Sequence, residues 1–300
     1  MSIDVVEAIA EMRALVDAAR AGGQVVGLVP TMGYLHAGHR SLVERAADEC
    51  GFVVVSVFVN PLQFGPGEDL DRYPRDLPGD LATAELGGAH VVFHPGPAEM
   101  YPEGAPLTRV IVSELTEPLC GRARPGHFDG VSTVVAKLLA ICDPDRAYFG
   151  RKDAQQLAVV RRMAADLNFR TRIVACPTLR EPDGLAMSSR NAYLTPEERA
   201  AAPALYAALM AATGVVVAGE RETRVVEAKI SAELTGRPRL DVEYAEVRDA
   251  RTLAHPDQLT GEVLLAVAAR CGSARLIDNV VIDLSGPRPA VDAGEIKGEP

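Results

Sequence analysis

The sequence predicts an α/β protein with a doubly wound, mostly parallel sheet, followed by a smaller α+β domain. Three observations predict this fold class. Apolar strand-like runs alternate with helical patterns up to about residue 176. The run 52–59 is almost continuously apolar, as expected of a strand that is covered on both faces. Beyond Pro177 the alternation stops, and helices are followed by three consecutive strand candidates.

The elements of the first part follow from apolar spacing and flanking residues. An amphipathic helix is predicted within residues 1–20, whose acidic side chains argue against a signal or transit peptide. The predicted strands are 24–29, 52–59, 90–93, 146–149 and 171–176, and the predicted helices are 39–49, 79–86, 131–141 and 153–167. Ligands bind at the carboxyl ends of parallel strands, so the segments after these strands are the candidate binding segments.

The second part begins with a helix signal. Thr195 and Glu198 form a capping box with Pro196 at the first helical position, and Pro203 should interrupt that helix. A helix over 222–234 and strands over 240–247, 263–268 and 275–283 follow. We expect a catalytic domain over 1–178, a smaller α+β lid domain over 179–285, and a disordered tail over 286–300, which is rich in Pro, Gly and charge.

Composition limits the function classes. The chain has 300 residues, 48% of them hydrophobic and 24% charged, which is typical of a soluble globular protein. A formal net charge of −10 argues against nucleic-acid and acidic-membrane partners. No apolar run reaches the roughly 18 residues that span a bilayer. The five cysteines form no CxxC pair, so we expect neither structural zinc nor a disulfide framework, and a cytoplasmic location.

Two histidines follow the first predicted strand. His36 and His39 enclose Gly38 at the start of a helix, after the Pro-Thr-Met-Gly run at 30–33. Free N–H groups and the positive dipole end of a helix favour an anion there. The pair could be surface or capping residues, or half of a metal site, although no third zinc ligand is near. Alternatively, both imidazoles donate hydrogen bonds to a phosphate and stabilise charge that develops on it.

Two further segments carry groups that bind phosphate. The run Met-Ser-Ser-Arg at 187–190 precedes the capping box, and arginine is a bidentate phosphate ligand. Lys152 follows the strand 146–149 and lies at a helix start, with Asp153 as a candidate cap or ribose ligand. Either segment alone could be an ordinary polar turn. Together with the histidine pair they predict a phosphate site.

Amide side chains lie near other strand ends. Asn60 and Gln63 follow the strand 52–59, and Gln155 and Gln156 open the helix 153–167. Amide donors and acceptors beside apolar neighbours suit a small, branched, hydroxylated acid. Each amide alone could equally cap a turn.

In these residues the chain resembles the pantothenate synthetases, or pantoate–β-alanine ligases. That family has PTMGxLHxGH, FVNPxQF, FGxKDxQQ and DGLAMSSRN in this order, and the chain has the corresponding residues at 30–39, 58–64, 149–156 and 183–191. It is also similar to the wider nucleotidyltransferase superfamily, whose HIGH and KMSKS motifs correspond to HxGH and MSSR. The resemblance implies a Rossmann-like sheet of the nucleotidyltransferase type in residues 1–178.

The resemblance implies a two-step ligase reaction. ATP and (R)-pantoate form pantoyl adenylate and pyrophosphate, and the amine of β-alanine then attacks the acyl carbon to give pantothenate and AMP. Such chemistry needs mainly positioning and charge stabilisation. The family also implies Mg²⁺ accompanying ATP, and a homodimer.

The resemblance also implies the site residues. The catalytic residues would be His36, His39, Lys152 and Arg190, with His39 as a proton donor. The ATP-binding residues would be Pro30, Thr31, Met32, His36, Gly38, His39, Gly150, Lys152, Asp153, Leu179, Met187, Ser188, Ser189 and Arg190. The residues binding pantoate and β-alanine would be Met32, Asn60, Gln63, Arg124, His127 and Gln156.

Asp80 is the candidate metal ligand. Some family members have an Asp-Asp pair and a nearby glutamine where this chain has Gly79, Asp80 and Thr83. The resemblance therefore implies a magnesium ion held mainly by phosphates and water, with Asp80 as the protein ligand to test.

Three other functions are weighed against the ligase. An adenylyl- or cytidylyltransferase with a different acceptor would share HxGH but would not need Asn60, Gln63 and Gln156. A tRNA-charging enzyme is disfavoured because the chain is short and acidic. A regulatory protein that has lost catalysis would bind ATP without releasing AMP, and the intact catalytic candidates argue against it.

Overall fold

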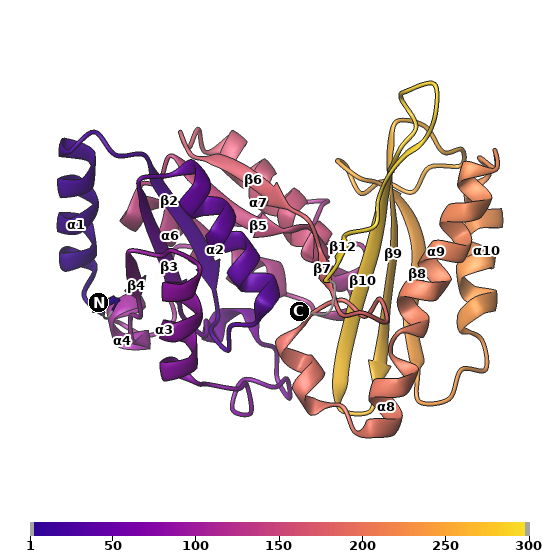
Figure 1. The fold of residues 1–300 in the computed structure, drawn as a ribbon, viewed down its shortest axis with the longest axis horizontal. Coiled ribbons are helices and arrows are strands. Elements are labelled where there is room, and N and C mark those ends of the chain that lie inside the picture. The colour runs from indigo at the N-terminus through magenta and orange to yellow at the C-terminus, as the bar shows by residue number, and fades with distance from the viewer. Residues whose placement is uncertain (1–2, 298–300) are drawn as a thin grey trace. The chain divides into compact units, whose positions relative to one another are not determined.

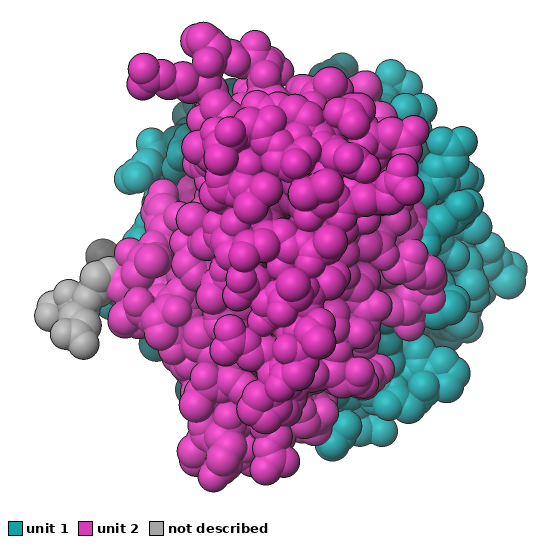
Figure 2. Space-filling view, turned by 90° about the vertical axis from the view of Figure 1, so that its right-hand side faces the viewer, with its two compact units in different colours: residues 1–117, 124–150, 159–176 teal, residues 118–123, 151–158, 177–300 magenta. Residues whose placement is uncertain are grey.

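The computed structural model describes residues 3–297, and the chain divides into two compact units (Figures 1 and 2). Unit 1 comprises Met1–Glu117, Arg124–Gly150 and Val159–Cys176, and unit 2 comprises Pro118–Ala123, Arg151–Ala158 and Pro177–Pro300. Unit 2 thus includes two short segments, Pro118–Ala123 and Arg151–Ala158, that come earlier in the sequence than its main part. The roles expected for residues 1–178 and 179–285 stay predictions.

Unit 1 contains the predicted parallel sheet. Within residues 3–297 its strand order is β1-β4-β3-β2-β5-β6, and all neighbours are parallel. The strands are β1 (Asp4–Val6), β2 (Val26–Thr31), β3 (Phe52–Val57), β4 (Val91–Phe93), β5 (Arg146–Gly150) and β6 (Arg172–Cys176). The chain leaves β2 toward β3 and β4 and later returns to β5 on the other side of β2. The order therefore reverses between β2 and β5, where sheets of this class bind ligands.

Helices cover both faces of this sheet (Figure 1). They are α1 (Ile9–Ala21), α2 (Ala37–Glu49), α3 (Leu77–Leu86), α4 (Pro97–Met100) and α6 (His127–Cys142), while α7 (Ala154–Asp166) spans both units. Val53, Val55 and Val57 of β3 share a core with Val43 of α2. Val54, which points to the opposite face, is also fully buried. The continuous apolar run therefore has its predicted cause, burial on both sides.

Unit 2 is an antiparallel sheet covered by helices, which confirms the predicted α+β class. Its main sheet has the order β11-β10-β9-β8, and α9 and α10 pack against it (Figure 1). The elements are α5 (Cys120–Ala123), η2 (Arg151–Asp153), β7 (Leu179–Arg180), η3 (Ser189–Tyr193), α8 (Pro196–Ala201), α9 (Ala204–Val217), α10 (Thr223–Leu234), β8 (Asp241–Asp249), β9 (Glu262–Cys271), β10 (Ala274–Asp283), β11 (Ala290–Asp292) and β12 (Glu295–Ile296).

The predicted helix signals are confirmed at α8. The hydroxyl of Thr195 accepts a hydrogen bond from the Glu198 backbone, and the Glu198 carboxylate accepts one from the Thr195 backbone. Helix α8 ends at Ala201 and α9 begins at Ala204, so Pro203 does interrupt the helix.

Two sequence-based expectations are wrong at the chain ends. Residues 4–6, expected to be helical, form β1, because they pair with β4 far along the chain. The tail over 286–300, expected to be disordered, contains β11, which pairs with β10, and β12, which pairs with β7. Backbone pairing with the neighbouring strand β10 and with the distant strand β7 stabilises the tail despite its Pro- and Gly-rich composition. Residues 298–300 lie outside the described residues.

One stretch of the described chain, Pro196–Val217, is long and apolar enough to cross a membrane by length and composition. Its Leu205, Leu209 and Val216 belong to the core of unit 2. Because core helices pass the same test, this stretch is weak evidence for a membrane span.

Helix α6 approaches the short helix η1 (Pro61–Gln63) closely at Gly130. A Cβ added at Gly130 would lie 2.2 Å from the Leu62 carbonyl oxygen and 2.6 Å from the Gln63 nitrogen. Both are backbone atoms, which cannot move aside as a flexible side chain can. Gly130 is therefore required by packing.

We predict that Gly130→Ala destabilises the protein by about 1–3 kcal/mol, because an extra methyl forces the backbone of η1 to shift. The matched control is Gly214→Ala in α9, where an added Cβ meets nothing within 4 Å. That control should be neutral or up to about 1 kcal/mol more stable, since alanine is the better helix former. Urea titration followed by circular dichroism measures both, and equal effects of the two changes would contradict this packing account.

Candidate active site

The loop between β2 and α2 brings the first candidate residues to the edge of the sheet. Pro30 and Thr31 end β2, and the Thr31 hydroxyl donates to the Ser56 carbonyl at 2.7 Å. Gly33 has a φ of 86° and Tyr34 a φ of 52°, so the chain turns sharply through the left-handed region. The turn directs the following residues into the first turn of α2.

His36 and His39 are held by backbone donors. The Gly38 N–H donates to Nδ1 of His36 at 3.1 Å, and the His36 N–H donates to Nδ1 of His39 at 3.3 Å. The ring centroids are 4.1 Å apart. A nitrogen that accepts carries no proton, so the neutral rings carry theirs on Nε2. The predicted pair is therefore oriented by the helix cap, with both Nε2 atoms as hydrogen-bond donors.

The carboxylate of Asp80 accepts hydrogen bonds from the loop between β2 and α2. Its Oδ1 accepts from the Leu35 N–H at 2.6 Å and its Oδ2 from the Tyr34 N–H at 3.1 Å. A Cβ at Gly33 would approach Oδ2 to 2.9 Å. Burial raises the pKa of Asp80, although the two backbone hydrogen bonds act to lower it.

These contacts do not fit the predicted role of Asp80 as a metal ligand. The residue is 2% exposed, and both of its oxygens already accept backbone hydrogen bonds. Within residues 3–297 there is also no group of three or more His, Cys, Asp or Glu side chains that could hold a metal ion. The carboxylate instead satisfies the N–H groups of a turn that would otherwise be buried without partners.

Asn60 and Gln63 form a buried amide pair next to Met32. Nδ2 of Asn60 donates to Oε1 of Gln63 at 3.2 Å and to the Gly130 carbonyl at 3.1 Å. Nε2 of Gln63 contacts the Met32 sulfur at 2.9 Å. Burial raises the pKa of Tyr101, whose protonated hydroxyl donates to Oδ1 of Asn60 at 2.8 Å. Asn60 is thus saturated by protein groups and orients the amide of Gln63.

The side chains of Arg124 and His127 both contact the backbone carbonyl of Gln63. Nη2 of Arg124 donates to the Gln63 carbonyl at 3.2 Å, and Nδ1 of His127 lies 2.7 Å from the same oxygen. Arg124 also forms a bidentate pair with Glu68, with N–O distances of 2.7 and 2.6 Å. Burial would raise the pKa of Glu68, but the hydrogen bonds and charge of Arg124 lower it to about 2. The ion pair neutralises Arg124, so both residues position Gln63.

In unit 2, Lys152 and Asp153 lie in η2 at the start of α7. The Asn279 side chain of β10 donates to the carbonyls of Arg151 and Lys152, at 3.0 and 2.7 Å. Sequence reasoning missed Asn279, since its partners are more than a hundred residues earlier in the chain and no spacing rule links them. Gly150 ends β5 in unit 1.

The segment 179–191 forms a tight hairpin-like turn in unit 2. The Met187 N–H donates to the Leu179 carbonyl at 3.0 Å, which brings these two predicted residues together. Ser188 caps η3, its hydroxyl accepting from the Arg190 N–H at 3.3 Å. Ser189 is buried and Arg190 half-buried.

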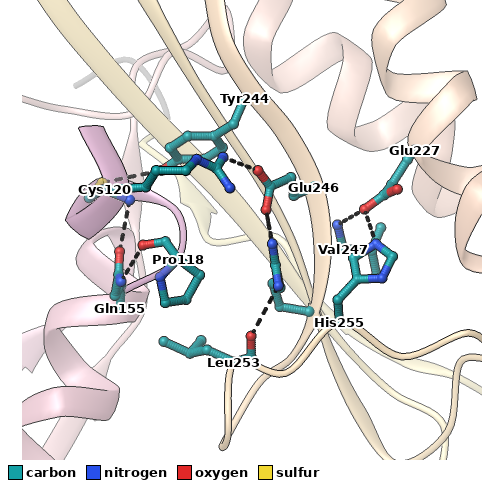
Figure 3. A network of polar contacts seen from close by, with 11 residues as sticks. Pro118, Cys120, Gln155, Glu227, Tyr244, Glu246, Val247, Leu253 and His255 are labelled. Carbon is teal, nitrogen blue, oxygen red and sulfur yellow. Dashed lines mark hydrogen bonds and ion pairs between the residues drawn. The ribbon is translucent and has the colours of Figure 1, made fainter. Parts of the chain in front are cut away.

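Gln155 has a structural role (Figure 3). Its Oε1 accepts from the Cys120 N–H at 2.9 Å, and its Nε2 donates to the Pro118 carbonyl at 2.7 Å. Of the two alternatives for Gln155, a ligand contact or a local structural role, these contacts favour the second, because both ends of its amide hold α5. Gln156, the next residue, is half-buried, and its binding role stays a prediction.

Each unit thus groups part of the predicted set. Unit 1 brings Met32, Asn60, Gln63, Arg124 and His127 into one hydrogen-bonded cluster and carries the two histidines on the cap of α2. Unit 2 joins Lys152 to β10, and β10 also contacts η3, which carries Ser189 and Arg190. The residues that sequence reasoning missed, Glu68, Tyr101 and Asn279, support site residues from distant segments.

We predict that Glu68→Gln changes how stability depends on pH. Because the pKa of Glu68 is lowered from 4.5 to about 2, its ionised form stabilises the fold above about pH 4.5, and this contribution is lost as the pH falls toward 2. The free energy of unfolding of the parent protein should exceed that of Glu68→Gln most at about pH 7, and the gap should narrow as the pH falls below 4.5. Chemical unfolding at several pH values measures it, and a gap independent of pH would overturn this reading.

Comparison with known proteins agrees with the resemblance seen in the motifs. A family model described as Pantoate-beta-alanine ligase matches residues 4–281. The pantothenate synthetase of Geobacillus kaustophilus is 53% identical over 296 residues, which cover 98% of this chain and 97% of the relative. That of Acetivibrio thermocellus is 50% identical over 280 residues, which cover 93% and 99% of the two chains.

Solved structures of related enzymes are also similar to the structure of this chain. Pantothenate synthetase from Thermus thermophilus superposes with a TM-score of 0.87 at 49% identity, covering 92% of this chain and 98% of that one. The Francisella tularensis pantoate-β-alanine ligase, whose crystals contained a β,γ-ATP compound and β-alanine, has a TM-score of 0.76 at 33% identity, over 93% and 97% of the chains. The sheet class, the ordered motifs and these matches agree, and the chain belongs to the pantoate-β-alanine ligase family.

Proposed function

We propose that this chain condenses (R)-pantoate with β-alanine in an ATP-dependent reaction, giving pantothenate, AMP and pyrophosphate through a pantoyl adenylate. The observation that carries the assignment of its site is the cap of α2, where backbone donors fix Nδ1 of His36 and of His39. In the neutral rings, Nε2 is then the hydrogen-bond donor, and both rings lie at a positive helix end. Such preorganised donors suit an adenylation reaction, whose charge develops on phosphate.

The histidines bind and stabilise the ATP phosphates in this proposal. The family resemblance implies that His39 is the proton donor, and its neutral ring presents an Nε2–H when Nδ1 accepts from the His36 backbone. Pro30, Thr31, Met32 and Gly38 frame the same loop. The rigid cap reduces the reorganisation needed as charge builds up.

Residues of unit 2 stabilise the α-phosphate and the departing pyrophosphate. Lys152 and Arg190 supply positive charge, and Ser188 and Ser189 supply hydroxyl groups. We assign the adenosine part to Gly150, Asp153, Leu179 and Met187. The contact between Leu179 and Met187 in the structure supports treating those two as one binding element.

Pantoate and β-alanine are assigned to the amide cluster. Gln63, Gln156 and Met32 contact the substrates, with Gln63 presenting an amide that Asn60 orients. Arg124 and His127 act by holding the Gln63 carbonyl, since Glu68 occupies the guanidinium of Arg124. Their proposed role is thus support of the substrate site, which refines the expectation of direct binding.

Magnesium, assembly and location are further parts of the proposal. We expect Mg²⁺ to bind through ATP phosphates and water, because the contacts of Asp80 do not fit a protein ligand. The family resemblance implies a homodimer, which light scattering on the purified protein tests, and the cysteine pattern favours a cytoplasmic location. The lid role of residues 179–285 stays a prediction.

The test of the function is AMP release from ATP with (R)-pantoate and β-alanine omitted in turn. AMP formation should require both acids, and pyrophosphate exchange should require pantoate alone. Turnover with another small acid or a phosphorylated acceptor, and none with pantoate, would instead indicate a transferase with a different acceptor. ATP binding without AMP release would indicate a protein that has lost catalysis.

In the same assay, His39→Ala should lower kcat by about 10²–10³, the cost of losing one preorganised donor. The matched control is Arg40→Ala on the same turn, whose guanidinium pairs with Glu44 along the helix at 2.7 Å. The control should keep the parent rate. A His39→Ala variant that turns over as fast as the parent would show that His39 has no catalytic role.

A further inference from the structure

Unit 2 contains a fully buried ion pair that none of the proposed substrate contacts uses. The side chains of Arg180 and Asp278 are 0% and 3% exposed. Their two hydrogen bonds are bidentate, with Nη1–Oδ2 at 2.7 Å and Nη2–Oδ1 at 2.8 Å. Burying two charges is costly unless every donor finds an acceptor, so the remaining contacts of this pair decide what it does.

Every N–H of Arg180 has an acceptor. Besides Asp278, Nη1 donates to the Gly184 carbonyl at 3.0 Å, Nη2 to the Asn279 carbonyl at 3.3 Å and Nε to the Ala293 carbonyl at 2.5 Å. The guanidinium carbon lies 4.0 Å from the centre of the Tyr206 ring. One side chain thereby joins β7, the turn at 184, β10 and the segment that precedes β12.

Asn279, the residue after Asp278, extends this network to Lys152. It is 7% exposed, and its backbone N–H donates to Oδ1 of Asp278 at 2.7 Å. Its Nδ2 has two hydrogens, and it donates to two successive carbonyls, those of Arg151 at 3.0 Å and Lys152 at 2.7 Å. The donors of this amide are saturated by the backbone of η2.

Fixing these two carbonyls fixes the backbone from which the Lys152 side chain projects. Lysine has a long, flexible stem, so its ammonium can be placed accurately only if its base is rigid. We propose that Asn279, anchored by the Asp278–Arg180 pair, is the positioning residue for Lys152 in the adenylation step. This inference rests on the proposed function, since it assumes that Lys152 acts on the phosphates.

The inference predicts a kinetic loss in Asn279→Ala and Asn279→Leu. Both variants remove the amide donors, and leucine keeps a buried side chain of similar size. Misplacing Lys152 should lower kcat for pantoate-dependent pyrophosphate exchange by up to about 100-fold, with a smaller change in the KM for ATP. A loss in the alanine variant alone would assign the effect to packing and overturn the proposal.

Thr223→Val is the matched control. Thr223 is at least as buried as Asn279, and its hydroxyl donates to the Pro256 carbonyl at 2.5 Å, remote in sequence from η2. The Thr223→Val substitution therefore removes a buried hydrogen bond between a side chain and a backbone carbonyl in the same unit. The control should lower the melting temperature without changing kcat. A kcat loss in the control equal to that in Asn279→Ala would mean that any destabilisation of unit 2 slows the reaction, and would overturn the proposal.

A double-mutant cycle with Lys152→Ala separates the two levels of inference. If Asn279 acts through Lys152, Asn279→Ala should cost nothing further once Lys152 is alanine. Additive losses, or a normal rate in Asn279→Ala beside a slow Lys152→Ala, would overturn the positioning role alone. A normal rate in Lys152→Ala would refute the proposed role of Lys152 and, with it, the positioning proposal.

Discussion

The parallel pairing of β2 with both β3 and β5 is the constraint on which the rest of unit 1 depends. It places β2 at the point where the strand order reverses, so the loop after β2 opens at the carboxyl edge of the sheet. The same loop begins α2, whose N-terminus favours an anion. Burial of β3 on both faces holds this arrangement, because its valines pack on either side of the sheet.

Buried polar side chains support the candidate site residues within each unit. Asp80 accepts two backbone hydrogen bonds from the histidine loop, Asn60 orients the Gln63 amide, and Asn279 binds the carbonyls of η2. Each is costly to bury and is retained with its hydrogen-bonding groups satisfied. They determine the backbone from which the proposed contact residues project. The residues proposed to touch substrate are thus supported by a layer of side chains that does not.

The motifs alone indicated the proposed contact residues but not the side chains that support them. His36 and His39 lie three residues apart at a strand-to-helix junction, a local pattern that indicates an anion site without any knowledge of the fold. Arg124 and Asp80 carry charges that suggest substrate and metal binding, but Glu68 and two backbone N–H groups occupy them. Those partners lie tens of residues away, so no local spacing could have revealed them. The same holds for β12, which pairs with the distant strand β7, and strand pairing outweighs composition in the tail.

By itself, the sequence determined the sheet class, the interrupted helix at Pro203, the ordered motifs and the family they indicate. These follow from apolar period, capping residues and short motifs, which act over one or two turns of chain. Only the tertiary structure decided which polar side chains hold the backbone, because local patterns do not separate that use from ligand binding. Ligand binding and backbone support need the same types of side chain. Backbone support is recognised only from the hydrogen-bond partner that folding brings near. That partner is 45 residues away in sequence for Asp80 and 127 residues away for Asn279.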